Sequence, residues 1–248
     1  MVQPLTLDDG PRLYGDLAWL WPIVSPPADY LEECEEYRRL IAQRSQFPAK
    51  SLLHLGSGGG HHDSHLKRRF AVSGVDSSPA MLALAGQLNP DVTYHAGDLR
   101  DIRLNVAFDA VAYMLSPGDL RAAFATAFAH LRPGGVFLTV VEMSAEQFQQ
   151  NQTWTSASIA GDTEVVLIEN AYDPDRSDTT YEATFLYLIR RFGRLTIEAD
   201  RHTCGIFPLQ TWLDLLADVG FVQMRQNELA PPGTADETST VLTALRGG

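Results

Sequence analysis

A glycine-rich turn at residues 56–60 is the stretch of this chain best suited to binding a ligand. An apolar run at 52–55 ends at this turn, and a helix-like segment follows it. That pattern predicts a buried strand that turns sharply into a helix. Glycine lets the backbone approach a ligand where a Cβ would collide, and the helix behind the turn offers unpaired N–H groups to a carboxylate or hydroxyl-rich ligand. The candidate ligand contacts in the turn are Gly56, Ser57, Gly58 and Gly60.

The spacing of these glycines distinguishes between two kinds of nucleotide site. Dinucleotide-binding enzymes carry G-x-G-x-x-G, whose third glycine would fall at position 61, where this chain has His61. Here the glycines follow G-x-G-x-G, with a further glycine at position 59. The spacing therefore argues against an oxidoreductase.

Acidic residues end the next two predicted strands. The segment 71–76 is apolar and ends at Asp76, some twenty residues past the first glycine, where an acid can accept both ribose hydroxyls of an adenosine. The segment 92–99 contains Asp98 and Leu99. Two further strands are predicted at 108–114 and, after the turn Pro133-Gly-Gly135, at 136–140.

These segments, in this order between about residues 50 and 142, resemble the class I S-adenosylmethionine (SAM) dependent methyltransferases. The resemblance implies an α/β fold with a Rossmann-like, doubly wound, seven-stranded sheet. It implies that Asp76 binds the ribose, that Asp98 and Leu99 meet the adenine, and that Ser77 and Met81 flank both. It implies SAM as cofactor and S-adenosylhomocysteine as product. The remaining cofactor contacts expected from the family layout are Tyr14, Tyr30, His54, His61, Tyr113 and Met114.

One position departs from the family pattern. The family usually has Asp or Glu two residues before the first glycine, and this chain has His54. Two interpretations stay open: His54 contributes to the network around the methionine end of the cofactor, or it is a buried strand histidine with a partner of its own.

The amino-acid composition indicates which binding partners and which cellular compartment to expect. The chain has 248 residues, a formal net charge of -12 and only two lysines, Lys50 and Lys67. It therefore lacks the clustered basic residues from which a nucleic-acid surface is built. Its two cysteines, Cys34 and Cys204, make no disulfide framework, and no apolar run reaches membrane-spanning length. A cytoplasmic protein that binds neither nucleic acid nor membrane is expected, and the resemblance is to bacterial enzymes.

The chain divides into four predicted parts. Residues 1–48 form a leader rich in proline and aromatic side chains and then a helix from about 29 to 46, capped by Asp29. Residues 49–143 form the SAM-binding core. Residues 144–206 form an antiparallel β insertion, with strands expected at 164–168, 179–191 and 194–198. Residues 207–248 return to the core sheet with a helix at 209–219 and strands at 221–226 and 238–246.

A cluster of histidines follows the glycine turn. His61 and His65 lie four residues apart, which would put both on one face of a helix and suggests a metal site. No second ligand cluster occurs in the sequence, so no metal is expected. His61 or His62 near the methionine end of the cofactor is the preferred interpretation.

Methyl transfer from a sulfonium needs mainly the correct placement of the acceptor, and a base only if the acceptor arrives protonated. Candidates for the base lie near the carboxyl ends of the fourth and fifth strands or come from the insertion. They are Tyr113, Ser116, Glu142 and His202.

The leader and the insertion resemble those of bacterial aminosugar and natural-product methyltransferases. The leading hypothesis is transfer of a methyl group to a nitrogen or oxygen of a small molecule, held in a closed pocket between leader and insertion. The alternatives are a protein side-chain methyltransferase and a non-catalytic SAM-binding protein. A homodimer is expected through aromatic residues of the insertion, namely Phe185, Tyr187 and Phe192.

Overall fold

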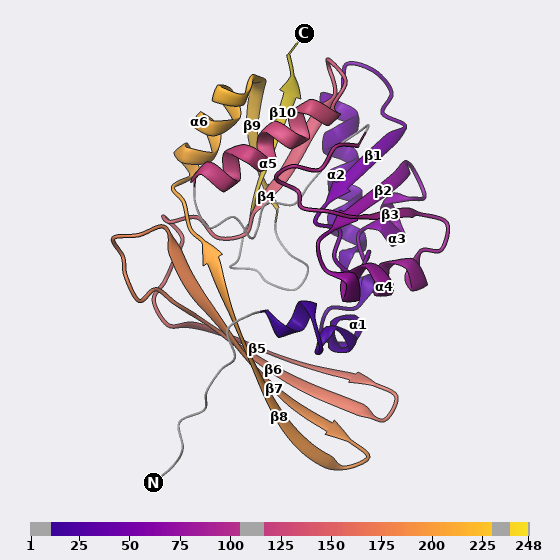
Figure 1. The fold of residues 1–248 in the computed structure, drawn as a ribbon, viewed down its shortest axis with the longest axis vertical. Coiled ribbons are helices and arrows are strands. Elements are labelled where there is room, and N and C mark those ends of the chain that lie inside the picture. The colour runs from indigo at the N-terminus through magenta and orange to yellow at the C-terminus, as the bar shows by residue number, and fades with distance from the viewer. Residues whose placement is uncertain (1–10, 105–116, 230–238, 248) are drawn as a thin grey trace.

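The computed structural model describes residues 11–104, 117–229 and 239–247 of the chain. An α/β body lies at one end of the molecule, and a long antiparallel sheet extends from it at the other end (Figure 1). The strand expected at 108–114, with the candidate site residues Tyr113, Met114 and Ser116, lies outside the described residues.

The first half of the body is a three-stranded parallel sheet. Its strands are β1 (Ser51–Leu55), β2 (Ala71–Asp76) and β3 (Thr93–Ala96), in the order β1-β2-β3. The helices α3 (Asp63–Leu66) and α4 (Pro79–Leu88) connect them. Strands that alternate with helices in a parallel sheet confirm the α/β class expected from the sequence.

The second half of the body is a three-stranded sheet in the order β4-β10-β9, with antiparallel pairing throughout. Its strands are β4 (Val136–Val141), β9 (Phe221–Leu229) and β10 (Ser239–Arg246), and the helices α5 (Pro117–His130) and α6 (Leu209–Val219) belong to the same half. The expected helix at 209–219 and the antiparallel pairing of the last two strands are confirmed. A single seven-stranded sheet would also need the strand at 108–114, and it stays a prediction.

One hydrophobic core joins the two halves of the body. It includes Leu53 of β1, Val75 of β2, Phe124 of α5 and Phe137 of β4, all less than 2 % exposed. The rings of Phe124 and Phe137 meet edge to face with centroids 5.5 Å apart. The helix α2 (Leu31–Arg44) buries its own apolar side chains in this same core.

Residues 152–205 form a four-stranded antiparallel sheet in the order β5-β6-β7-β8. Its strands are β5 (Gln152–Ala160), β6 (Thr163–Tyr172), β7 (Thr180–Arg191) and β8 (Arg194–Gly205). The strand β5 was not expected from the sequence, because its side chains are mostly small or polar and lack an apolar alternation. The strands β6 and β8 are longer than predicted, since each continues along its partner, and β7 agrees with its prediction to within one residue.

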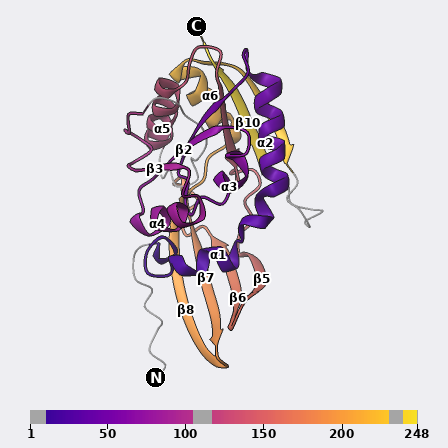
Figure 2. The ribbon, with the colours of Figure 1, turned by 90° about the vertical axis from the view of Figure 1, so that its right-hand side faces the viewer.

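The leader is a series of short helical turns, η1 (Arg12–Tyr14), η2 (Ala18–Leu20), α1 (Trp21–Val24) and η3 (Pro27–Tyr30). It lies between α4 and one face of the antiparallel sheet, as Figure 2 shows for α1. Leu13, Leu17 and Leu20 of the leader form a second core with the sheet residues Val165, Tyr187 and Ile189. The leader therefore connects the insertion to the body.

This packing corrects two expectations about exposed aromatic residues. Tyr187 is fully buried and Phe185 is partly buried under the leader, so neither is free to form a dimer surface. Phe192, at the turn between β7 and β8, is 77 % exposed.

Two predictions about helices also differ from the structure: the cap of α2 and the length of the helix after the glycine turn. The residue before α2 is Tyr30 rather than Asp29, which lies inside η3, and no side chain caps α2. The helix after the glycine turn is only one turn long, because the N–H groups of Arg68 and Arg69 bond three residues back and tighten the chain into turns. Ser78 caps α4, since its Oγ accepts from the Met81 N–H at 3.1 Å.

Candidate active site

The glycine turn leaves β1 and crosses directly over the end of β2. The N–H groups of Gly56 and Ser57 both donate to the Val75 carbonyl, at 2.7 and 2.9 Å. Gly56, Gly58 and Gly60 have φ values of 74°, 51° and 74°, in the left-handed region that favours glycine. A Cβ added at Gly58 would meet no atom within 4 Å, so this part of the turn faces open space.

Asp76 links the end of β2 to the glycine turn. One carboxylate oxygen accepts the Gly58 N–H and the other accepts the Ser78 N–H, both at 2.8 Å. A carboxylate has about four acceptor positions, so each oxygen can accept one more hydrogen bond. Ser57 is buried, and its Oγ has no partner among the described residues. The acceptor capacity of Asp76, the open side of Gly58 and the unpartnered Ser57 hydroxyl together fit the ribose of an adenosine cofactor.

Ser78 attaches the leader to this same loop. Its hydroxyl donates to the Tyr14 carbonyl at 2.6 Å while accepting from the Met81 N–H. Met81 is fully buried at the start of α4, and Ser77 is exposed. The structure therefore brings Tyr14 to the predicted ribose site through its backbone, a contact that sequence reasoning missed.

The leader also contacts the glycine turn through Trp21. A Cβ added at Gly59 would lie 2.8 Å from Cδ1 of the Trp21 side chain. The sequence pointed to Trp21 only as an aromatic residue to be buried. The structure instead places it directly against the turn that the cofactor would contact.

Asp98 has a strong protein partner that was not foreseen. Arg100 approaches both of its carboxylate oxygens through Nε and Nη2, and Arg100 also reaches Asp119. The hydrogen bonds from the Arg100 side chain hold the pKa of Asp98 below its ordinary value. Leu99 beside it packs partly buried against the body core. The adenine role of Asp98 stays a prediction, and Arg100 now competes for the same oxygens.

His54 is a buried strand histidine with its own acidic partner. Its Nδ1 lies 2.8 Å from the Asp63 carboxylate, whose other oxygen accepts the Tyr94 hydroxyl at 3.0 Å. Asn89 donates to that hydroxyl at 3.0 Å and to the Gly60 carbonyl at 2.8 Å. A chain of hydrogen bonds therefore runs from β1 to the glycine turn, and it favours the second of the two interpretations of His54.

His61 lies among aromatic rings of the leader. Its ring centroid is 6.0 Å from that of Trp21 and 5.8 Å from that of Tyr30. Burial lowers the pKa of His61 to about 4, so the ring is neutral near pH 7. Tyr30 also lies 4.4 Å from His62, and burial raises the pKa of its hydroxyl to about 12, with smaller contributions from the carboxylates of Glu33 and Glu142.

His65 is separate from His61 and binds elsewhere. Its Nε2 lies 2.6 Å from the Pro27 carbonyl, where it ties α3 to the leader. Among the described residues, no group of three or more His, Cys, Asp or Glu side chains is arranged to hold a metal ion. Within the same residues, no helix is both long enough and apolar enough to cross a bilayer.

His202 is buried on β8 beside the leader. Its Nε2 lies 2.8 Å from the Asp200 carboxylate, and its ring centroid lies 5.3 Å from Tyr14 and 4.8 Å from Phe185. Burial alone would raise the pKa of Asp200, but hydrogen bonds from His202 and from the N–H groups of Leu13 and Arg12 hold it below its ordinary value. An ionised Asp200 accepts a hydrogen bond from the Nε2–H group, and this bond orients the His202 ring.

Glu142 follows β4 and lies between the leader and the insertion. It is exposed, and its negative charge contributes to raising the pKa values of Tyr30 in the leader and of Tyr181 and Cys204 in the insertion. Burial is the main cause that raises the pKa of Cys204 to about 11, with contributions from Glu142 and Glu169. Cys34 and Cys204 are both buried free thiols, as expected.

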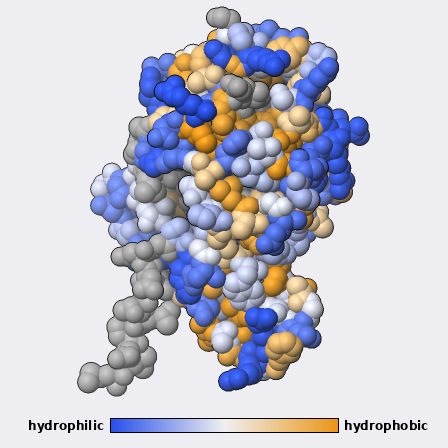
Figure 3. Space-filling view, turned by 45° about the vertical axis from the view of Figure 1, so that its right-hand side comes forward, coloured by the Kyte–Doolittle hydropathy of each residue, from blue (hydrophilic) through white to orange (hydrophobic). Residues whose placement is uncertain are grey.

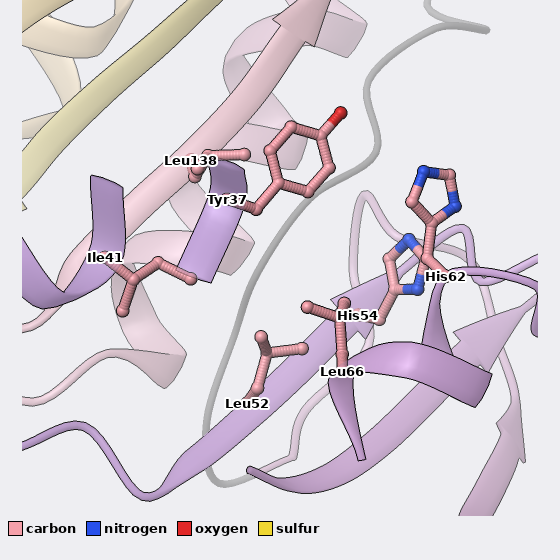
Figure 4. A pocket seen from close by; sticks show the side chains of 7 residues that line it. All are labelled: Tyr37, Ile41, Leu52, His54, His62, Leu66 and Leu138. Atoms are coloured by element: carbon pink, nitrogen blue, oxygen red, sulfur yellow. The ribbon is translucent and has the colours of Figure 1, made fainter. Parts of the chain in front are cut away.

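Figure 4 shows a small hollow beside the histidine network. His54 and His62 lie next to one another on one side of it, and Tyr37 faces them from α2. Its volume of about 10 Å³ has room for about one water molecule, so it is not the site of SAM or of an acceptor. The closed acceptor pocket expected between leader and insertion stays a prediction.

The structure therefore brings together the glycine turn, Asp76, Tyr14 and His202 through the leader. Sequence reasoning missed Asp63, Asp200, Arg100 and Trp21 as partners of the predicted site residues. The only sequence signal for Asp200 was its place two residues before His202, which puts both side chains on one face of a strand.

Comparison with known proteins agrees with this geometry. Residues 52–135 match the family model described as a methyltransferase domain. The chain is 34% identical over 139 residues to the dTDP-3-amino-3,4,6-trideoxy-alpha-D-glucopyranose N,N-dimethyltransferase of Streptomyces venezuelae, covering 53% of this chain and 57% of that one. It is 32% identical over 167 residues to the dTDP-3-amino-3,6-dideoxy-alpha-D-glucopyranose N,N-dimethyltransferase of Streptomyces fradiae, covering 63% and 65%. The chain thus spans less than two thirds of the length of either relative.

Two solved structures share the fold over nearly the whole chain. Streptomyces venezuelae DesVI superimposes with a TM-score of 0.79 at 22% identity, covering 93% of this chain and 95% of that one. SAM-bound CalS10, an amino pentose methyltransferase from Micromonospora echinaspora, superimposes with a TM-score of 0.74 at 22% identity, covering 98% and 99%.

Proposed function

We propose that this chain is a class I SAM-dependent methyltransferase that methylates a nitrogen or oxygen of a small molecule. The match of residues 52–135 to a methyltransferase domain and the fold shared with solved methyltransferases support this proposal. The observation that carries the proposal is the position of Tyr14. Its carbonyl is bonded to Ser78 beside Asp76, and its ring lies 5.3 Å from His202 of the insertion. The leader thus contacts both the loop of the expected cofactor site and the insertion, and an enclosed acceptor between them would suit this arrangement.

SAM, when bound, supplies the methyl group on a sulfonium. Asp76 would hold the ribose hydroxyls, Gly58 would allow the close approach of the backbone, and Ser57 would contribute its buried hydroxyl. Met81 and Leu99 would border the adenine. The neutral ring of His61, with Trp21 and Tyr30 around it, would line the methionine end without adding a positive charge.

The acceptor would lie between leader and insertion, facing Tyr14 and His202. Asp200 holds His202 in one orientation, and the imidazole of His202 would take a proton from an acceptor that arrives protonated. The carboxylate of Glu142, which acts on both Tyr30 and Tyr181, would attract a cationic amine to this space. Curated relatives that match the chain are named as N,N-dimethyltransferases of dTDP-linked amino sugars. An amino group on a sugar of this kind is therefore the first acceptor to test.

Turnover tests the proposal directly. The purified chain is incubated with SAM and with three acceptor sets: dTDP-amino sugars, matched dTDP-sugars that carry a hydroxyl in place of the amine, and unfolded protein as a source of side chains. Production of S-adenosylhomocysteine with the amino sugars, and a mass gain of one or two methyl groups on them, is expected. Turnover with protein alone would favour the side-chain alternative. SAM binding without turnover on any set would favour the non-catalytic one.

A further inference from the structure

Gly59 is the glycine of the turn that the local backbone does not require. The left-handed φ values of the turn belong to Gly56, Gly58 and Gly60, and position 59 is not among them. A Cβ at Gly59 would instead lie 2.8 Å from Cδ1 and 3.3 Å from Nε1 of the Trp21 side chain. The first of these distances is too short for any real Cβ, so glycine at position 59 is what lets the Trp21 ring lie against the turn.

Trp21 extends from the insertion to this turn. It is the first residue of α1, which packs on β5 and β6, and Figure 2 shows α1 at the junction of the body and the antiparallel sheet. The half-buried Trp21 side chain also packs against the core that the leader forms with the sheet. Gly58, which donates its N–H to Asp76, precedes Gly59. The Trp21 ring therefore lies between the expected ribose site and the insertion.

Trp21 belongs to a run of aromatic rings contributed by the leader, the glycine turn and the insertion. Its ring centroid lies 6.2 Å from that of Tyr14 and 6.0 Å from that of His61. The centroids of His61 and Tyr30 lie 5.8 Å apart. The Tyr14 ring continues the run to His202 of the insertion, at 5.3 Å. The run thus connects the glycine turn with the space proposed for the acceptor.

The rings on either side of His61 lie in surroundings that favour a positive charge. Burial lowers the pKa of His61 to about 4, so its ring is neutral near pH 7. Burial also raises the pKa of Tyr30 to about 12, with contributions from carboxylates such as Glu33 and Glu142. The whole chain carries a formal net charge of -12, and Figure 3 shows hydrophilic side chains spread over much of the surface. The local charges and the net charge therefore both attract a cation to these rings.

We propose that Trp21 recognises the positive charge of the SAM sulfonium and thereby makes this chain favour SAM over S-adenosylhomocysteine. This inference rests on the proposed function, in which SAM is the cofactor. A sulfonium has no hydrogen to donate to an acceptor, so a protein recognises it through its charge. The face of an indole ring is the aromatic surface that attracts a cation most strongly. S-adenosylhomocysteine has the same adenosine and amino-acid groups with a neutral sulfur, so it lacks this attraction.

A packing role alone is the alternative for Trp21. The ring would then serve only to fix α1 against the glycine turn, since it packs against both the turn and the leader core. In that case, removal of the ring loosens the leader and weakens both ligands alike, because they differ only in the methyl group and its charge. The ratio of the two dissociation constants therefore separates recognition of the charge from packing.

Titration calorimetry of the full chain with SAM and with S-adenosylhomocysteine measures this ratio. Trp21→Leu replaces the ring by an apolar side chain, so the Kd for S-adenosylhomocysteine divided by the Kd for SAM should fall by about 5-fold or more. Trp21→Phe keeps an aromatic face and should retain most of the wild-type ratio. The matched control is Trp19→Leu in the same leader. Trp19 is 39 % exposed, and its ring centroid lies 5.5 Å from the guanidinium carbon of Arg191, so both dissociation constants should stay unchanged.

Circular dichroism of each variant establishes that it is folded. Should Trp21→Leu fail to fold, Trp21→Met serves in its place, because its flexible apolar chain fills the space of the ring without an aromatic face. A folded Trp21→Leu or Trp21→Met that keeps the wild-type ratio overturns the proposal, even where both ligands bind more weakly. The proposed function fails by a different result, SAM binding without turnover of any acceptor, and that result leaves the ratio measurable.

Discussion

His54 and Asp63 form a buried ion pair or hydrogen bond, with 2.8 Å between Nδ1 and the carboxylate oxygen. The family's usual acid would stand at position 54, on β1. In this chain the carboxylate comes instead from Asp63, on the helix that follows the glycine turn, and the histidine takes the strand position. The Asp63 carboxylate is still connected to the glycine turn. It accepts the Tyr94 hydroxyl, and Asn89 donates both to that hydroxyl and to the Gly60 carbonyl.

Because the histidine and the acid have changed places, we predict that an aspartate at position 54, as in the family pattern, destabilises this chain. His54→Asp places two carboxylates in contact in a buried site, where both cannot be ionised. We expect the variant to lose about 3 kcal/mol of unfolding free energy, measured by urea denaturation.

The double variant His54→Asp with Asp63→Asn is the control. The amide at position 63 can donate to the new carboxylate, so most of the stability should return. If the single variant is as stable as the wild type, the pair does not hold the turn as described.

A second prediction concerns the pH dependence of stability at His61. Burial lowers the pKa of His61 from 6.5 to about 4 in the folded chain. Above pH 6.5 the ring is neutral in both states, so its full contribution to stability is present. As pH falls from 6.5 towards 4, the unfolded chain takes up a proton that the folded chain does not, and stability is lost. The loss from this group between about pH 7.5 and about pH 5 is about 2 kcal/mol.

His61→Gln isolates this contribution from the other titrating groups. Its side chain is uncharged throughout the range, so its unfolding free energy should fall less on acidification, by about 2 kcal/mol. Urea denaturation of both proteins at the two pH values gives the comparison. If the unfolding free energy fell by the same amount in both proteins between the two pH values, the buried neutral state of His61 would be contradicted.

The third prediction separates the two acids of the cofactor site. Asp76→Ala should weaken SAM binding by about 2–3 kcal/mol, because ribose hydroxyls lose their acceptor and the Gly58 and Ser78 N–H groups lose theirs. Asp98→Ala should cost less, since Arg100 already pairs with Asp98 and backbone groups near Leu99 remain. Calorimetry measures both affinities. Unchanged binding by Asp76→Ala would remove Asp76 from the ribose.

Structural features that depend on residues close together in the sequence were predicted correctly. The glycine turn and the helix at 209–219 each follow from residue types within a few positions, and both are present. The Asp29 cap failed because η3 continues directly into α2 and leaves no place for a cap. The strand β5 was missed because its place in the sheet comes from pairing with β6 rather than from an apolar pattern of its own.

Contacts between distant residues could not be read from the sequence. Asp200 accepts the N–H groups of Arg12 and Leu13, which lie 188 and 187 residues earlier in the chain, and these contacts lie on the face of the insertion that the leader covers. Phe185 and Tyr187 looked exposed because nothing in the strand pattern says which side the leader occupies. Tyr113 and Met114 lie outside the described residues, so their roles stay predictions.

The last prediction concerns His202 as the proton acceptor. If the acceptor is a protonated amine that gives its proton to His202, His202→Gln should lower kcat by about 100-fold or more. Asp200→Asn should lower kcat as well, because the amide cannot hold the ring in the same tautomer, while SAM affinity by calorimetry stays unchanged in both variants. His95→Gln on β3 is the matched control and should keep wild-type kcat. The outcome that contradicts the role is a His202→Gln enzyme with wild-type kcat, since the acceptor would then reach the site already deprotonated and His202 would serve only to hold the leader.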